Sequence, residues 1–371
     1  MHDLTFELSF WEVLYYFAII SALSIVGGLV GNKLKIPAGG MLGAMLAMLV
    51  FNLLYQPTFS LPAGFLVALQ LAFGPMLGSR ISRDDIGGLI RLAKPASVIV
   101  AIMLAFNIIF GIAMSHLTRL DVATTLFATA PGGMMDMAIV SADFGANSAY
   151  VALLQLSRII FILVCMMPFY KKFRKSEVID EQLKDEMKEE EKPEAVASNS
   201  KRSTKQQIAH YLITMLYGSV LGLLFRQIGI PAGGIIGAML GAAIYNISTK
   251  KAYFPPEMRL PLQIIAGTFI GFRMDRASLL AMGELILPVL ILFVCVIVIT
   301  SVTAFVVHKV TGLDMFTALL ASTPGGLSEM ALLADDVGAD APKVALLHMA
   351  RLITVIVVFP SVLALVLMLL S

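Results

Sequence analysis

The sequence predicts an all-α polytopic membrane protein made of two homologous, inverted repeats, and three observations lead there. The chain has 371 residues, of which 58% are hydrophobic and only 14% charged, with a mean hydropathy of +0.87. A soluble domain would carry far more charge. The charge is also concentrated, because 10 of the 27 basic and 9 of the 25 acidic residues lie between Lys171 and Lys205. On either side of that stretch, similar apolar segments recur.

Each half offers six apolar segments, of which the fifth is interrupted or shorter than the ~20 residues of a clean helical span. In the first half we expect them at Phe10–Val30, Ile36–Leu54, Leu61–Leu77, Ala96–His116, Thr124–Val140 and Tyr150–Phe169. In the second half we expect them at Ala209–Leu224, Ile230–Tyr245, Leu260–Phe272, Leu285–Val307, Thr317–Leu333 and Val344–Leu370.

The two halves repeat each other at a nearly fixed offset. PAGGMLGAML at 37–46 returns as PAGGIIGAML at 231–240, an offset of 194. From the third segment onward the offset is 193 and pairs, for example, Gly145 with Gly338 and Arg158 with Arg351. Such internal symmetry is typical of transporters built from repeats. We therefore divide the chain into a membrane repeat at 1–170, a charged linker at 171–205 and a second membrane repeat at 206–371.

The charges of the loops predict the topology. The linker is too polar to bury a core, and its leading basic residues directly follow a membrane span. We therefore expect the linker on the cytoplasmic side of a bacterial inner membrane. The N-terminus lacks the basic region of a signal peptide and is expected outside. Five crossings plus one re-entrant hairpin per repeat satisfy both conditions and leave the C-terminus outside. The arginines that do not fit this charge pattern are Arg119, Arg226, Arg273 and Arg276.

The predicted hairpins carry the motif around which both repeats are organised. It reads ATAPGGMMDMAIVSADFG at 128–145 and ASTPGGLSEMALLADDVG at 321–338. Proline ends a helix and paired glycines allow close backbone approach, so the unpaired peptide groups must line a cavity that protein or water fills. A proline kink with small packing residues is the alternative. We predict a substrate site at the two tips, formed by Pro131, Gly132, Gly133, Pro324, Gly325, Gly326 and Ser328.

Charged side chains accompany both motifs. Asp136 and Glu329 are carboxylates within apolar segments, where an ionisable group is costly unless it has a function, and we predict that they couple an ion. Arg158 and Arg351 lie within the last helix of each repeat. They suit two roles equally well, an internal arginine–carboxylate pair or a bidentate clamp on a substrate carboxylate.

Further polar pairs are related by the repeat. Gln155 and His348 precede the two arginines by three residues and share their helical face, either as second-line contacts to the substrate or as ordinary interhelical hydrogen bonds. Asn147 and Asp340 are expected to cap the last helices. The two PAGG segments have the small-residue pattern of close helix packing.

Enzymatic chemistry finds little support in the sequence. The five histidines are scattered without ligand spacing, and both cysteines lie within apolar runs. We find no phosphate-binding loop, no nucleophile–base pair and no basic face suited to nucleic acid. The sequence therefore predicts no enzyme, no cofactor and no bound metal. As partners we expect the lipid bilayer and a small-molecule or ion substrate, no direct contact with nucleic acid, and leave a homodimer open.

The PAGG segments at 37–46 and 231–240 and the motifs at 131–137 and 324–330 resemble the bacterial membrane "AbrB duplication" family. Members of that family carry labels as regulators of gene expression or as ammonia monooxygenases. The pattern is also remotely similar to elevator-type secondary transporters, which bind carboxylates or ions at hairpin tips.

Three functions remain open at this point. The leading one is a secondary transporter of a small organic anion coupled to H⁺ or Na⁺. The second is a membrane-embedded regulator or sensor that acts through its cytoplasmic linker. The third, a membrane monooxygenase, is disfavoured because it requires a metal site.

Overall fold

The computed structural model describes residues 10–34, 38–55, 63–166, 168, 170, 204–274, 281–325, 330, 334 and 338–370. Within these residues every regular element is a helix, as the sequence predicts. Residues 171–203 of the predicted linker and the motif residues Pro37, Gly326, Ser328 and Glu329 lie outside the described residues, whereas the last two linker residues begin the helix Thr204–Gln227.

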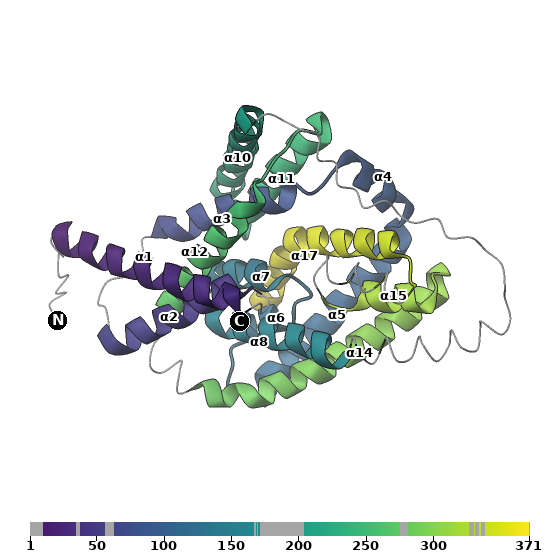
Figure 1. Cartoon of the computed structure of the whole chain (residues 1–371). Coiled ribbons are helices and arrows are strands. Elements are labelled where there is room, and N and C mark those ends of the chain that lie inside the picture. Colours follow the sequence, from purple (N-terminus) through teal and green to yellow (C-terminus); the bar gives the residue numbers. More distant parts are fainter. Residues whose placement is uncertain are drawn as a thin grey trace.

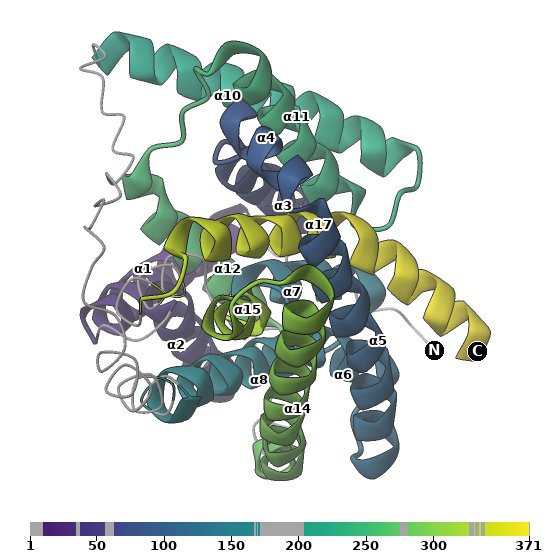
Figure 2. The same cartoon turned by 90° about the vertical axis from the view of Figure 1, so that its right-hand side faces the viewer.

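The helices form two groups, and each group takes members from both repeats (Figure 1). The first group consists of α1 (Phe10–Lys33), α2 (Gly39–Tyr55), α3 (Ala63–Gly78), α10 (Thr204–Gln227), α11 (Gly233–Thr249) and α12 (Arg259–Phe272). The second consists of α5 (Ala93–Leu117), α6 (Val122–Thr129), α7 (Met134–Ser141), α8 (Ser148–Phe161), α14 (Ile286–Thr311), α15 (Met315–Ser322) and α17 (Ala341–Leu370). In both views α10 and α11 lie on one side of α17, and α5 and α14 on the other (Figures 1 and 2).

Shorter elements connect these helices. They are α4 (Arg83–Arg91), the 3₁₀ turns Ala142–Phe144, Pro256–Met258 and Ala281–Leu285, and a π-helical turn at Ile162–Met166. The sequence analysis did not predict α4. It is a short polar helix that begins with a capping box, in which the Ser82 hydroxyl accepts from the Asp85 amide and the Asp85 carboxylate accepts from the Ser82 amide.

Six helices are long and apolar enough to cross a bilayer, so the chain is a multi-pass membrane protein. They lie at Tyr15–Lys33, Ala93–Leu117, Ser148–Met166, Gln206–Gln227, Gly283–Thr311 and Ala341–Leu369. The shorter apolar helices α2, α3 and α11 belong to the first group, in which α2 packs against α1 and α12 and α11 packs against α10 and α3.

Backbone contacts explain the PAGG segments. A Cβ atom on Gly43 would collide with the backbone of Gly27 on α1, and one on Gly237 with the backbone of Leu221 on α10. Ala232, at the start of the second segment, has a positive φ of 54°, a conformation unusual for a side-chain-bearing residue. The packing interpretation of these segments is therefore confirmed.

Helix-end contacts show that the two repeats are inverted. The amide of Asn52, near the end of α2, donates to the carbonyls of Gly271, Phe272 and Met274 at the end of α12. The amide of Asn246, near the end of α11, donates to Ser79 and Ile81 at the end of α3.

Each asparagine therefore holds the C-terminal end of a helix from the other repeat. The chain from Tyr55 to Ala63 spans at most about 29 Å, less than a hydrocarbon core of about 30 Å. Helix α3 therefore begins on the face where α2 ends, and it ends on the opposite face. Hence α11 runs opposite to its counterpart α2, and α12 opposite to α3. In the second group, a guanidinium nitrogen of Arg119, just after the end of α5, lies 3.5 Å from a carboxylate oxygen of Glu284, just before the start of α14. The end of α5 thus lies beside the start of its counterpart α14, and these two helices are also antiparallel.

Candidate functional site

The interrupted fifth segment of the first repeat is a hairpin. Helices α6 and α7 have eight residues each and are separated by the residues Ala130–Gly133. The backbone N–H of Asn147, just beyond the hairpin, donates to the hydroxyl of Thr124, at the start of the hairpin, over 2.9 Å. Entry and exit therefore lie together, and because eight helical residues rise about 12 Å, the tip lies about that far from both of them.

The second repeat closes its fifth segment in the same way. The Asp340 amide donates to the Thr317 hydroxyl over 3.0 Å, at the positions equivalent to Asn147 and Thr124. Asn147 and Asp340 also cap α8 and α17 through their side chains, as predicted. Since the repeats are inverted, the two hairpins enter the membrane from opposite faces.

Arg158 of α8 holds the first tip through the backbone. Its two terminal nitrogens donate to the carbonyls of Ala130 at 2.5 Å and Gly132 at 2.7 Å. Gln155, one turn earlier, donates to Phe127 at 2.8 Å and to Ala130 at 3.0 Å. Helix α6 ends here without the next turn that would satisfy its last carbonyls, so these two side chains replace the missing donors.

Arg351 of α17 repeats this arrangement at the second tip. Its terminal nitrogens donate to the carbonyls of Thr323 and Gly325, both at 2.8 Å. His348 lies 2.9 Å from the Leu320 carbonyl through Nε2. All three acceptors correspond, at the offset of 193, to those of the first repeat, and we call each arginine with its two carbonyls a clasp.

Arg158 forms no ion pair with a carboxylate among the described residues, and its planar guanidinium fork binds main-chain carbonyls instead. For Arg351 the internal pair stays a prediction, because Glu329 lies outside the described residues. Arg158 is 2% exposed and Arg351 5%, and neither Nε atom has a partner among the described residues. The substrate-clamp role stays a prediction.

The two clasps lie near each other. The charges of Arg158 and Arg351 act on one another, and Phe127 of α6 packs edge-on against Phe359 of α17, with 5.4 Å between the ring centroids. Two tips from opposite faces thus bring two buried guanidinium groups into one region.

Asp136 sits in the first turn of α7 and is 5% exposed. Its carboxylate lies over Gly133, where an added Cβ atom would collide with Oδ2. A negative charge is favourable at a helix N-terminus, and the charge of Arg80 also acts on this group. A carboxylate is therefore held at the first tip, whereas its counterpart Glu329 lies outside the described residues.

The other described tip residues are two prolines and two glycines. Pro131 and Pro324 stand in the two breaks, and added Cβ atoms on Gly132 and Gly325 would meet the side chains of Met137 and Met330. The glycines are thus needed for two methionines to fold over the tips.

One positioning residue was not predicted from the sequence. Asn107 of α5 is fully buried and donates to the Leu126 carbonyl at 2.9 Å and to the Thr129 hydroxyl at 2.7 Å, so it steadies the end of α6. A lone amide in the apolar run of α5 was the signal that could have revealed it.

Two arginines that did not fit the charge pattern have an explanation. The charges of Arg226 and Arg273 act on Asp143, at the end of the first hairpin. Gln70 of α3 donates to the same carboxylate over 2.7 Å, which ties the hairpin to the first helix group.

Within the described ranges, no three or more histidine, cysteine, aspartate and glutamate side chains lie together as a metal site would require.

Comparison with known proteins agrees with the internal repeat. The chain is 24% identical over 359 residues to "Uncharacterized protein YhjN" of Bacillus subtilis (strain 168), covering 91% of this chain and 90% of that protein. It is also 24% identical over 348 residues to "Putative regulator AbrB" of Escherichia coli (strain K12), with 93% of both chains covered. A family model described as "Transition state regulatory protein AbrB" matches twice, at residues 2–174 and 186–367. The chain therefore belongs to the AbrB family, as a membrane protein that contains the family unit in duplicate.

Proposed function

We propose that this protein is a secondary transporter of a small organic anion, with its substrate site between the two hairpin tips. The observation that carries the proposal is the pair of clasped breaks, one in each repeat. In this proposal they enter from opposite faces and meet near the middle of the membrane. Discontinuous helices from inverted repeats form the substrate sites of many transporters. A protein that served only as a membrane anchor would have no need of two broken helices at this depth.

The charge at the tips favours an anion. Two guanidinium groups lie close together, and no carboxylate pairs with either among the residues that the structure describes. Unpaired buried cations are costly, and a carboxylate between them would offset that cost. Each clasp uses two of the five N–H donors of its guanidinium, so the Nε–H group and a second N–H on each terminal nitrogen remain to bind it.

We assign ion coupling to Asp136 and its repeat partner Glu329. A buried carboxylate at a tip can bind H⁺ or Na⁺ and so link the charge state of the site to the ion gradient. In this proposal the substrate binds when the carboxylate is neutralised, because an ionised Asp136 would repel an organic anion.

Ligand binding provides the first test. Purified protein is heated with a panel of organic acids, amino acids, ammonium and metal salts at two Na⁺ concentrations and two pH values. A native-state ligand present at 100 times its Kd stabilises by about 2.7 kcal/mol and raises Tm. We expect a small carboxylate to give the shift, and uptake of that carboxylate into proteoliposomes to depend on the H⁺ or Na⁺ gradient.

Two variants then separate charge from clasp geometry. Arg158→Lys keeps the positive charge and loses the fork, whereas Arg158→Gln keeps one amide donor and loses the charge. We expect the lysine variant to retain more affinity for the carboxylate than the glutamine variant, and Asp136→Asn to uncouple uptake from the gradient. Uptake unchanged in Arg158→Gln refutes the arginine's role in binding, and a screen without any carboxylate hit refutes the transporter proposal.

A further inference from the structure

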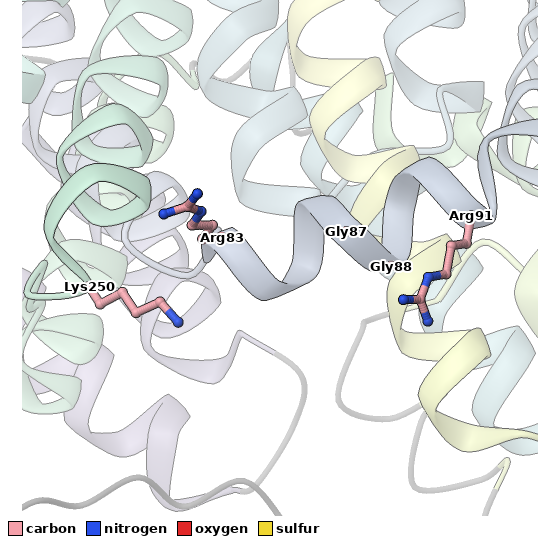
Figure 3. Close-up of a pocket in the computed structure, with 5 residues that line it drawn as sticks. All are labelled: Arg83, Gly87, Gly88, Arg91 and Lys250. Atoms are coloured by element: carbon pink, nitrogen blue, oxygen red, sulfur yellow. The ribbon is translucent and has the colours of Figure 1, made fainter.

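A second polar site lies far along the chain from the tips, where α4 of the first repeat meets the end of α11 of the second. It is an open pocket of about 560 Å³ lined by Arg83, Gly87, Gly88, Arg91 and Lys250 (Figure 3). We infer that this pocket binds a phosphate-bearing anion, either the headgroup of an anionic lipid or a soluble phosphate compound. The inference does not depend on the proposed transport function.

The charge of the pocket is the first argument. Its described lining contains three basic residues and no acidic one. The ion pairs formed by described residues, Arg119–Glu284 and Lys343–Asp340, involve neither Arg83 nor Arg91. Of the two acids on α4, Asp85 turns away to cap the helix, and the side chain of Asp84 lies outside the described part of the structure. Guanidinium groups bind phosphate oxygens in a bidentate way, and lysine adds a point charge.

The shape of the pocket is the second argument. Arg83 and Arg91 are eight residues apart on one helix, which corresponds to about 12 Å along its axis. Lys250 and Arg83 lie near one end of α4 and Arg91 at the other, with the two glycines between them (Figure 3). An added Cβ atom on Gly87 would meet nothing within 4 Å, so the floor is open backbone. An anion that extends along α4 can therefore contact all three cations.

The position of α4 gives such a ligand a consequence. Gly88 packs directly under Leu346 of α17, the helix that carries the second clasp. An anion that bridges α4 and Lys250 thus connects the first helix group to α17. The pocket also contains basic residues that the charge pattern places on the cytoplasmic side in both repeats, where anionic headgroups and soluble phosphates are found.

The test uses the full chain in nanodiscs of phosphatidylcholine, with tripolyphosphate as the soluble probe and phosphatidylglycerol as the lipid probe. The main variant is Arg83→Gln with Arg91→Gln. Arg259→Gln, an exposed arginine outside the pocket, is the control for charge. Gly87→Trp fills the floor without changing charge, and Gly64→Trp, at another open glycine, is its control.

We expect tripolyphosphate affinity to fall at least tenfold in the double variant and in Gly87→Trp, and to stay within twofold in both controls. Competition identifies the source of the natural ligand. If phosphatidylglycerol displaces tripolyphosphate, and copurifies with the unmodified protein but not with the double variant, the ligand is a lipid headgroup. If tripolyphosphate binds equally in both lipids, it is a soluble phosphate. Equal affinity in all proteins, or an equal loss in Arg259→Gln, overturns the inference.

Discussion

Replacing Arg158 with lysine is expected to loosen the first hairpin by a measurable amount. The fork makes two charge-assisted bonds, to Ala130 and Gly132, and we expect an ammonium group, which lacks the planar fork, to keep one of them. The lost bond is worth about 1.5–3 kcal/mol. Since 1.4 kcal/mol is a factor of ten, the opened hairpin should become about 10- to 150-fold more populated.

Hydrogen exchange measures the population of the opened hairpin. The amide of Met137 donates to the Gly133 carbonyl over 2.9 Å in the first turn of α7, and it is released when the tip opens. Where opening and closing are fast, exchange of such an amide follows the population of the open state. Mass spectrometry of peptides that cover α7 should therefore show exchange accelerated by the same 10- to 150-fold, estimated from the lost bond.

Two comparisons make the experiment decisive. Ser157→Ala alters the neighbouring residue, whose hydroxyl donates only within its own helix to Leu154, and should leave α7 unchanged. Arg351→Lys should loosen the second hairpin more than the first. Exchange within twofold of the unmodified protein in Arg158→Lys, or an equal rise in Ser157→Ala, would show that the clasp does not hold the tip.

Further substitutions test the scaffold around the site. Asn52→Ala removes the amide that serves three carbonyls and should cost about 1–3 kcal/mol, and Asn246→Ala somewhat less because it serves two, as measured by the fall in Tm. A fall in Tm only at Asn246 would contradict this order. Gly43→Leu places a side chain against the backbone of α1 and should abolish monodisperse expression, whereas Gly64→Leu should be tolerated; equal yields would argue against the packing seam. Asn147→Ala removes the cap of α8 and should cost about 1 kcal/mol, and an unchanged Tm would count against that role.

The sequence predicted the fold well where repetition and hydropathy determine it. The offset between the repeats identified Arg158 and Arg351 as equivalent, and the proline and glycines at 131–133 located the break in the hairpin. The loop charges predicted inverted repeats, and the asparagine contacts at the helix ends confirm them. These features depend on residue type and spacing, which one sequence contains.

The partners of the arginines could not be predicted in the same way. Each fork binds main-chain carbonyls, and every residue has a carbonyl, so no side-chain pattern marks the acceptors. A buried arginine near a carboxylate in sequence suggests an ion pair, yet Asp136 faces the N-terminus of α7 while Arg158 faces the end of α6. Helix α4 was not predicted because it is short and polar, and hydropathy detects only long apolar segments.

Because the clasps act on main-chain oxygens, they place few demands on the side chains at the tips. The same geometry is made with Ala130 in one repeat and Thr323 in the other. Side chains at the tips can therefore be exchanged while the hairpins remain held in place. Sequence divergence at the tips is thus compatible with an unchanged helical scaffold.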